Sequence, residues 1–211
     1  MKIIQYKNYV FSFLGKQNLL NNNSSQFLNC AFGKGDSNFR VRSNRKLVSK
    51  LFNNKKIIFV NQIHSSRIFF YDKTRPYDIK ADGIITKNKN VLLGILTADC
   101  APVILLGKEY FGILHVGWRG LLNNIILNAV NFFIKRGEKK EDIKFFIGPH
   151  LKPKSFEVQS DFLENIKVLK NFSIYLKENK NRIFFNYTKL IEDKIKELGI
   201  DSYKTSEFDT Y

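Results

Sequence analysis

The chain has 211 residues, of which 44% are hydrophobic, so it is long enough to bury a sizeable core and too apolar to be disordered. Its apolar runs are too short to cross a bilayer and its first residues do not resemble a signal peptide, so we expect a cytoplasmic protein that does not bind membranes. The net charge of +16 comes from scattered lysines without a nucleic-acid-binding motif, which predicts a solvated basic surface and no nucleic-acid partner.

The first third of the chain predicts one helix between loops and short strands. Residues 17–26 are polar and predict a loop, and residues 33–36 predict a second, glycine-rich turn. The apolar residues of segment 41–52 recur at near-helical spacing. Two apolar runs then predict strands, at residues 57–60 and 68–71.

The middle of the chain is denser in apolar residues and predicts much of the core. Two short runs that favour β structure lie at residues 81–86 and 91–97. Residues 102–106 and 110–116 predict a hairpin that turns through the segment Gly107-Lys108-Glu109. The apolar residues of segment 121–134 follow the period of one amphipathic helix.

The last third predicts one more strand and two more helices. Residues 143–147 are apolar and predict a buried strand. Residues 155–170 and 187–198 have helical spacing, and Gly199 is well suited to end the second helix. Because no repeat or linker divides the sequence, we predict a single domain of mixed α and β structure over residues 1–211.

Three residues that can bind metal stand near the ends of predicted strands. His64 and His115 each end a strand, and Cys100 follows a third apolar run. A His-Cys-His set suits zinc, and three protein ligands leave the fourth position that catalytic zinc sites keep open. The three residues are too far apart in the sequence for a zinc finger. The alternative is two ordinary polar histidines and a buried thiol.

Five segments around these residues form a pattern: NQIH at residues 61–64, ADGIIT at 81–86, LTADCAPV at 96–103, HVGWRG at 115–120 and IGP at 147–149. In this order they resemble one bacterial family, which has been called laccase-like multicopper polyphenol oxidase, peptidoglycan editing factor, and purine nucleoside phosphorylase/adenosine deaminase. The blocks that hold Cys100 and His115 are the most specific, and the resemblance covers roughly residues 25–211.

The resemblance implies a fold and an activity. The expected fold is a layered α/β sandwich with central β-sheets flanked by helices. The expected activity is phosphorolysis of adenosine, inosine, guanosine and methylthioadenosine, together with deamination of adenosine, so the partners are a small nucleoside and phosphate. The metal expected at His64, Cys100 and His115 is Zn²⁺, with Cu²⁺ as the alternative.

Further residues near the three ligands have candidate roles. We expect Asp99, with Cys100 and His115, to act in catalysis, either as an acid or base or by orienting an imidazole; the alternative is a turn residue. The structural role is favoured for Asp82. His150 is expected at the surface.

Three residues are candidate substrate contacts. Arg45 and Arg119 could hold phosphate, because a guanidinium group binds phosphate with two hydrogen bonds. Arg119 could instead stack on Trp118. Gln62 could bind the base or the ribose, since it lies two residues before His64 and would point to the same side of a strand.

Other functions compete with the nucleoside enzyme. Cys100 as nucleophile and His115 as base would make a thiol hydrolase that edits peptidoglycan precursors. A copper-dependent polyphenol oxidase needs several copper centres built largely from imidazoles, and this chain has three histidines in total. A fourth alternative is an interaction protein without activity.

The C-terminus departs from the family pattern. The family usually continues past a Cys-Thr-Tyr segment into an aromatic, arginine-rich tail, whereas here Asp209 stands in place of the cysteine and the given sequence stops at Tyr211. Without that tail, we expect one wall of the substrate pocket to be open or to come from a neighbouring chain. We also expect weaker nucleoside affinity than in longer relatives.

Overall fold

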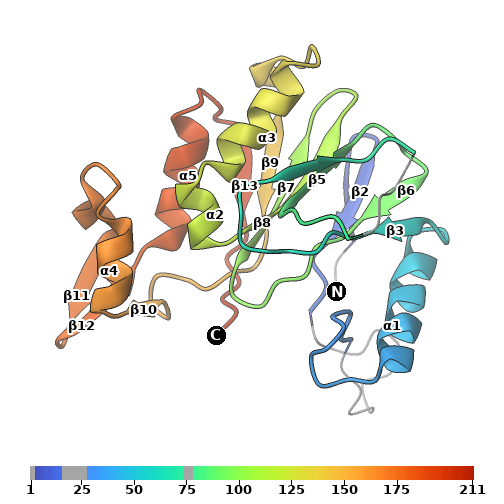
Figure 1. Ribbon diagram of the computed structural model, residues 1–211. Coiled ribbons are helices and arrows are strands. Elements are labelled where there is room, and N and C mark those ends of the chain that lie inside the picture. Colours follow the sequence, from blue (N-terminus) through green and yellow to red (C-terminus); the bar gives the residue numbers. More distant parts are fainter. Residues whose placement is uncertain (1–2, 16–27, 74–77) are drawn as a thin grey trace.

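The computed structural model describes residues 3–15, 28–73 and 78–211, and a mixed sheet stands at its centre (Figure 1). Its middle strands pair antiparallel and its outermost strands pair parallel. Within the described residues its strands are, from one edge to the other, β13 (Tyr203–Thr205), β9 (Lys144–Ile147), β7 (Ala101–Leu106), β8 (Phe111–Val116), β5 (Gly83–Thr86) and β4 (Ile68–Phe70). The loop predicted at residues 17–26 lies outside the described residues.

The predicted hairpin of β7 and β8 is present and forms the middle of this sheet. Every residue of β7 is buried, which explains its uninterrupted apolar sequence. The turn at Gly107 is closed by the carboxylate of Glu138, which accepts hydrogen bonds from the backbone N–H groups of residues 108, 109 and 110, at 2.8, 2.7 and 2.9 Å. The register pairs Pro102 with His115, so the start of β7 lies beside the end of β8.

Helices cover one face of the sheet, namely α2 (Trp118–Leu122), α3 (Ile125–Ile134) and α5 (Tyr187–Lys196) (Figure 1). The prediction of one helix over residues 121–134 is wrong, because the chain breaks at Asn123 and Asn124 into α2 and α3. Asn124 has a left-handed backbone with φ of 66°, which asparagine tolerates better than most residues. The apolar period nevertheless fits α3, whose buried side chains face the core.

A β-hairpin covers part of the other face of the sheet. It consists of β1 (Ile3–Tyr6) and β2 (Tyr9–Ser12), which pair antiparallel. Phe11 of this hairpin packs with Ile104, Leu106 and Phe146 of the sheet, and the ring centroids of Phe11 and Phe146 are 4.7 Å apart. The architecture is therefore mixed α/β and layered, as predicted, with a hairpin rather than helices on this face.

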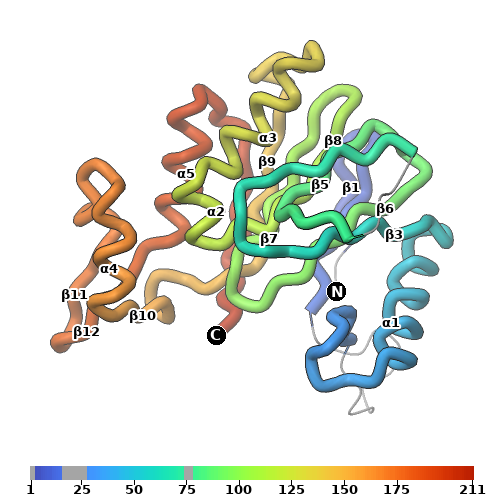
Figure 2. The backbone as a smooth tube through the Cα atoms, in the orientation of Figure 1, coloured from blue at the N-terminus to red at the C-terminus, as the bar shows by residue number. Residues whose placement is uncertain are grey.

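Two smaller units with sheets of their own lie on either side of the central sheet (Figure 2). The predicted helix at residues 41–52 is α1 (Asn38–Leu51), which packs near the parallel pair of β3 (Lys56–Ile58) and β6 (Val91–Leu93). Only the middle of the helix predicted at residues 155–170 is helical, because Glu157 and Val158 pair with a later strand. At this end the elements are β10 (Glu157–Val158), α4 (Ser160–Ile166), η2 (Phe172–Tyr175), β11 (Leu176–Asn179) and β12 (Arg182–Phe185).

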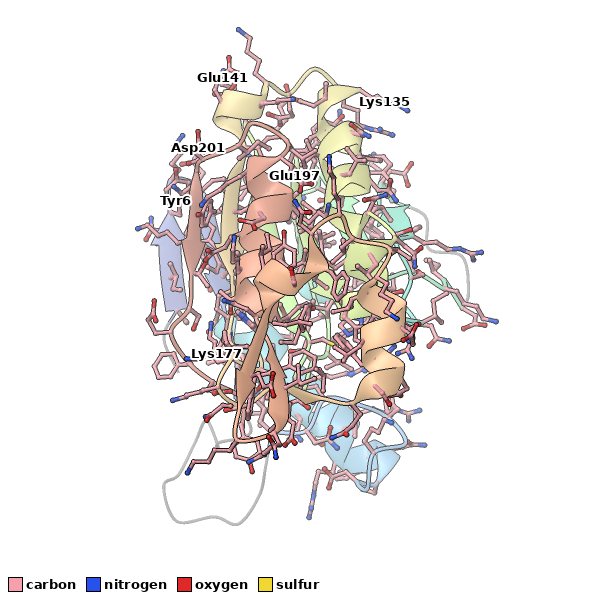
Figure 3. The ribbon with its side chains drawn as sticks, turned by 90° about the vertical axis from the view of Figure 1, so that its left-hand side faces the viewer. Tyr6, Lys135, Glu141, Lys177, Glu197 and Asp201 are labelled. Atoms are coloured by element: carbon pink, nitrogen blue, oxygen red, sulfur yellow. The ribbon has the colours of Figure 1, made fainter. Side chains whose placement is uncertain are left out.

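A short 3₁₀ helix, η1 (Lys140–Asp142), precedes β9 on the helical side of the sheet. Figure 3 places Lys135, Glu141, Glu197 and Asp201 at the outside of this part of the molecule. Among the described residues, no helix is both long and apolar enough to cross a membrane.

Candidate metal centre

Three side chains from distant parts of the sequence meet at one end of the central hairpin. One possible ligand atom from each of His64, Cys100 and His115 lies within 4.8 Å of the others. The imidazole rings of His64 and His115 are 4.7 Å apart between centroids and meet edge to face at 79°. The structure thus brings together the three residues that the sequence indicated.

The register of the hairpin explains how two of these residues meet. His115 is the last residue but one of β8 and is opposite Pro102 of β7, so Cys100, immediately before β7, lies next to the histidine. His115 is 4% exposed, Cys100 is half-buried and His64 is exposed. The group can therefore be reached from solvent on the side of His64.

Asp82 organises the other side of the site. Its carboxylate is fully buried and accepts hydrogen bonds from the backbone N–H groups of Ile63, His64 and Ser65, at 3.2, 2.9 and 2.6 Å. It also accepts one from the hydroxyl of Ser65, at 2.7 Å. These bonds hold the loop in the shape that gives His64 a left-handed backbone with φ of 57°.

The same carboxylate orients His115. The imidazole Nδ1 of His115 lies 2.8 Å from Oδ1 of Asp82. Burial raises the pKa of Asp82, but hydrogen bonds from His115 and Ser65 outweigh it and lower this pKa to about 2. Because the carboxylate is ionised, Nδ1 of His115 must carry the proton and donate it. Nε2 of His115 is then the nitrogen that can bind a metal.

The pKa values of the two histidines are shifted in opposite directions. Burial lowers the pKa of His115, but hydrogen bonds with Asp82 and Cys100 outweigh it and raise this pKa to about 9. Burial and the nearby charge of His115 lower the pKa of His64. Without metal, His115 therefore holds a second proton at neutral pH, and a metal that binds at Nε2 must displace it.

A glycine leaves room for these side chains. A Cβ atom on Gly117 would lie 3.2 Å from Cδ2 of His64 and 3.3 Å from Sγ of Cys100. Most real Cβ contacts are longer, so any larger residue here would push on two of the three donors. Gly120, on the following helix, approaches the same loop, since its Cβ would lie 2.7 Å from the carbonyl oxygen of Ser65.

The predicted substrate contacts lie in three different settings. Arg119 stacks on Trp118, with its guanidinium carbon 4.2 Å from the ring centroid, and its charge contributes to lowering the pKa of His64. The amide of Gln62 donates to the carbonyl of Leu96 at 2.7 Å and accepts from its N–H at 2.8 Å. This pairing ties the His64 loop to the segment that leads to Cys100.

Arg45 lies between two aromatic rings. Its guanidinium carbon is 4.0 Å from the ring centroid of Phe59 and 4.3 Å from that of Phe32, and its Nε donates to the carbonyl of Cys30 at 2.8 Å. These contacts hold the guanidinium group between the two rings. Its role in binding phosphate stays a prediction.

Of the two carboxylates considered for orienting an imidazole, Asp82 contacts His115 and Asp99 lies at the surface. The exposed carboxylate of Asp99 accepts a hydrogen bond of 3.2 Å from the hydroxyl of Thr210. The carboxylate that orients an imidazole is Asp82, so the acid–base role is what stays a prediction for Asp99. The sequence contains one indication of this role: Asp82 is a charged residue between Ala81 and Gly83, at the start of an apolar segment that is buried in the fold.

The prediction that His150 lies at the surface is wrong. His150 is fully buried, its Nδ1 is 2.8 Å from the carbonyl of Gly148, and its Nε2 is 2.8 Å from the hydroxyl of Thr188. It also packs edge to face on Tyr187, whose hydroxyl donates to the carbonyl of Val116. The bend at residues 148–149 turns the chain inward, which the sequence pattern did not reveal.

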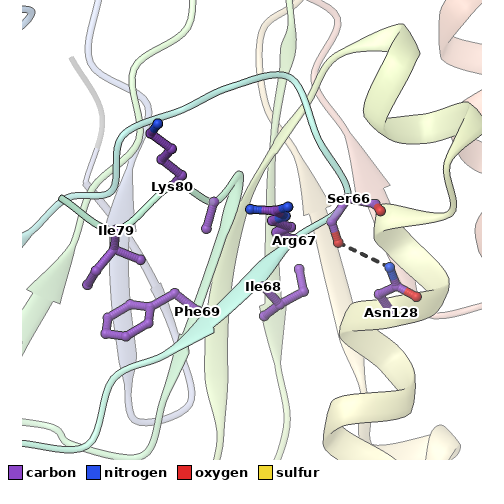
Figure 4. Close-up of a pocket in the computed structure, with 8 residues that line it drawn as sticks. Ser66, Arg67, Ile68, Phe69, Ile79, Lys80 and Asn128 are labelled. Atoms are coloured by element: carbon purple, nitrogen blue, oxygen red, sulfur yellow. Dashed lines mark hydrogen bonds between the residues drawn. The ribbon is translucent and has the colours of Figure 1, made fainter. Parts of the chain in front are cut away.

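A separate open pocket of about 490 Å³ lies beyond the His64 loop (Figure 4). The carbonyl of Ser66 there accepts a hydrogen bond of 3.1 Å from the amide of Asn128. Its lining residues are Ser66, Arg67, Ile68, Phe69, Ile79, Lys80, Ala81 and Asn128. Because none of the three donor residues lines this pocket, it is distinct from the metal centre.

Comparison with known proteins places the chain in a family. The sequence profile of the multi-copper polyphenol oxidoreductase laccase family matches residues 12–211. The chain belongs to this family. It is 36% identical over 173 residues to a purine nucleoside phosphorylase of Aquifex aeolicus, covering 81% of this chain and 80% of that protein. It is also 29% identical to the purine nucleoside phosphorylase RP494 of Rickettsia prowazekii, covering 100% and 88%.

Solved structures share the fold. YlmD from Geobacillus stearothermophilus has a TM-score of 0.82 at 20% sequence identity, covering 93% of this chain and 80% of that one. The hypothetical protein YfiH from Bacillus licheniformis has a TM-score of 0.80 at 23% identity, covering 88% and 76%. The mixed α/β architecture described above is therefore the fold of this family.

Proposed function

We propose that this chain is a purine nucleoside phosphorylase that also deaminates adenosine, and that it works with a Zn²⁺ ion held by His64, Cys100 and His115. The single observation that carries the proposal is the convergence of these three donors beside a buried carboxylate. The names of the relatives from Aquifex aeolicus and Rickettsia prowazekii support the choice of substrate.

The chemistry of the donor set fits zinc. Two imidazole nitrogens and one thiolate are preferred zinc ligands, and bonds of about 2.0–2.3 Å place tetrahedral donors roughly 3.5 Å apart. The donors of this chain lie within 4.8 Å of one another, so a small rotation of the exposed His64 would close the set. Copper also accepts imidazole and thiolate ligands, so Cu²⁺ is the alternative metal.

The proposed chemistry assigns a task to each group. When bound, zinc would act as a Lewis acid on an oxygen nucleophile, which is water for deamination and phosphate for phosphorolysis. Cys100 and His115 would serve as ligands, and Asp82 would keep Nδ1 of His115 protonated. Asp99 would move a proton at the exposed side of the site.

The substrate contacts are part of the same proposal. Arg119 would hold phosphate, since it lies near His64 and a guanidinium group suits a phosphate oxygen pair. Arg45 would be a second phosphate contact. One N–H of the Gln62 amide donates to the carbonyl of Leu96, and the second N–H would bind the base or ribose.

The products of one incubation test the proposal. The zinc-loaded chain is mixed with adenosine, with and without phosphate, and the products are separated by chromatography. We expect adenine and ribose 1-phosphate only when phosphate is present, and inosine in the reaction without phosphate. If neither adenine nor inosine forms, the proposal is wrong.

One observation favours a second function. Without metal, Cys100 and His115 are hydrogen-bonded, and such a pair is the arrangement of a thiol hydrolase, which could act on peptidoglycan precursors. Chelation separates the two functions. A zinc enzyme loses activity on dialysis against a strong chelator and regains it with added zinc, whereas a thiol hydrolase keeps its activity until Cys100 is alkylated.

The copper oxidase named by the family description has less support. Its several copper centres would need many imidazoles, and this chain has three histidines. His150 is fully buried with both ring nitrogens in hydrogen bonds, so His64 and His115 are the two that remain for metal. One mononuclear site is therefore what these imidazoles can build.

A further inference from the structure

Residues 206–211 are hydrogen-bonded to the loop that follows β9. Asp209 accepts hydrogen bonds from the N–H of Lys152 at 3.2 Å and from the hydroxyl of Ser155 at 2.7 Å. The ammonium group of Lys152 donates in return to the carbonyl of Ser206. The two carboxylate oxygens of Asp209 thus bind the loop after β9. The backbone N–H and the ammonium group of Lys152 both bind residues 206–211.

The fastened segment also contacts the turn that carries Cys100. The hydroxyl of Thr210 donates to the carboxylate of Asp99 at 3.2 Å, and the carbonyl of Asp99 accepts from the N–H of Leu151 at 3.0 Å. Asp99 is therefore held on one side by residues 206–211 and on the other by the loop after β9. Cys100 follows it directly. Figure 1 shows the C-terminal end beside the loop that leads into β7.

The segment presents aromatic surface next to this turn. Phe208 is 75% exposed, although large aromatic side chains are usually buried at least in part. Thr210 of the same segment contacts Asp99. Flat aromatic surface beside a nucleoside site is suited to stacking with a purine base.

We infer that Asp209 is a positioning residue, which holds residues 206–211 against the Asp99–Cys100 turn so that this segment forms one wall of the nucleoside site. The inference rests on the proposed function for the identity of the substrate. Asp209 acts through the segment and touches neither metal nor substrate. Its loss should raise the KM for nucleoside and leave the chemical step and the metal in place.

The test compares Asp209→Ala with Glu207→Ala, a matched change at an exposed carboxylate of the same segment. We expect Asp209→Ala to raise the KM for adenosine about tenfold with kcat within about twofold, since it removes the two hydrogen bonds that hold the segment to Lys152 and Ser155. Zinc content should equal that of the wild type. Glu207→Ala should leave all three quantities unchanged. An unchanged KM in Asp209→Ala, or a loss of zinc, would overturn the inference.

A second measurement does not depend on turnover. In chelator-treated protein, the alkylation rate of Cys100 by iodoacetamide, followed by peptide mass spectrometry, measures how far the segment limits access to this thiol. We expect Asp209→Ala to raise this rate about tenfold and Thr210→Val, which removes only the contact with Asp99, to raise it by a smaller factor. Equal rates in all chains would overturn the inference. If Asp209→Ala is alkylated faster but the wild type converts no nucleoside, the role of Asp209 in holding the segment is supported. The proposed function is then the part that is wrong.

Discussion

Asp82 and His115 form a hydrogen bond of 2.8 Å in which the carboxylate is fully buried and the imidazole is 4% exposed. The bond fixes which nitrogen of the ring is available to a metal. Since the same carboxylate also holds the backbone of His64, one side chain positions two of the three candidate ligands.

Replacing Asp82 by Asn should weaken metal binding. The amide keeps the shape of the carboxylate, but an NH₂ group replaces one of the two oxygens that accept hydrogen bonds from the His64 loop and from His115. We expect zinc affinity to fall about 10–100-fold, as for other carboxylates that orient a ligating histidine. Competition with a chromophoric chelator measures it. Asp201→Asn, at an exposed carboxylate, is the control, and equal affinities in both variants would contradict the role given to Asp82.

Replacing Cys100 by Ser should release most of the metal, because a hydroxyl is a far poorer zinc ligand than a thiolate. Both phosphorolysis and deamination should disappear together, since both are assigned to one ion. The fold should survive, which circular dichroism can check, because the core does not depend on the site. Cys30→Ser is the matched control for the other thiol and should retain its zinc by elemental analysis. Retained zinc in Cys100→Ser would remove this cysteine from the ligand set.

Replacing Gly117 by Ala should distort the site without changing its ligands. The new Cβ would press on His64 and Cys100, and sites of this kind need donors held within about 0.5 Å. We expect about tenfold weaker zinc binding and a smaller effect on stability. Gly15→Ala, where a Cβ meets nothing within 4 Å, is the control. The idea fails if the two alanine variants bind zinc equally well.

The stability of the fold should depend on pH through His150. Burial lowers the pKa of this residue from its ordinary 6.5 to about 4. As pH falls through this window, the unfolded chain takes up a proton that the folded chain does not, so the free energy of unfolding falls. The loss should be about 2 kcal/mol between pH 7 and pH 5.

Urea unfolding of the metal-free wild type and His150→Gln at the two pH values isolates this contribution, because all other groups are common to both chains. The variant should be less stable at pH 7 but should lose about 2 kcal/mol less on acidification. If both chains lose the same stability, His150 is not neutral in the fold.

The sequence predicts well those features that depend on neighbouring residues. Alternation and apolar runs identified β7, β8 and their turn, and residue chemistry identified His64, Cys100 and His115. The break between α2 and α3 was also visible in principle, because Asn123-Asn124 interrupts an otherwise apolar period. Two adjacent asparagines are a signal for a helix boundary.

Features that depend on distant partners were not visible. Residues 157–158 have helical spacing, but they pair with β12 some 25 residues later in the chain. The amide of Gln62 pairs with Leu96, and His150 is buried against Thr188. Each of these contacts satisfies a polar group inside the fold, and no local pattern records where its partner will lie.

The hairpin of β7 and β8 gives a distant turn control over the geometry of the metal centre. Glu138 closes the turn at Gly107, whereas the two ligands stand at the opposite, open end of the strands, about 20 Å away along six residues of strand. A single residue inserted into β8 would shift the pairing by one position and turn His115 to the other face of the sheet. Such a chain would keep every ligand in its sequence and have no site, so strand register specifies this centre as much as ligand identity does.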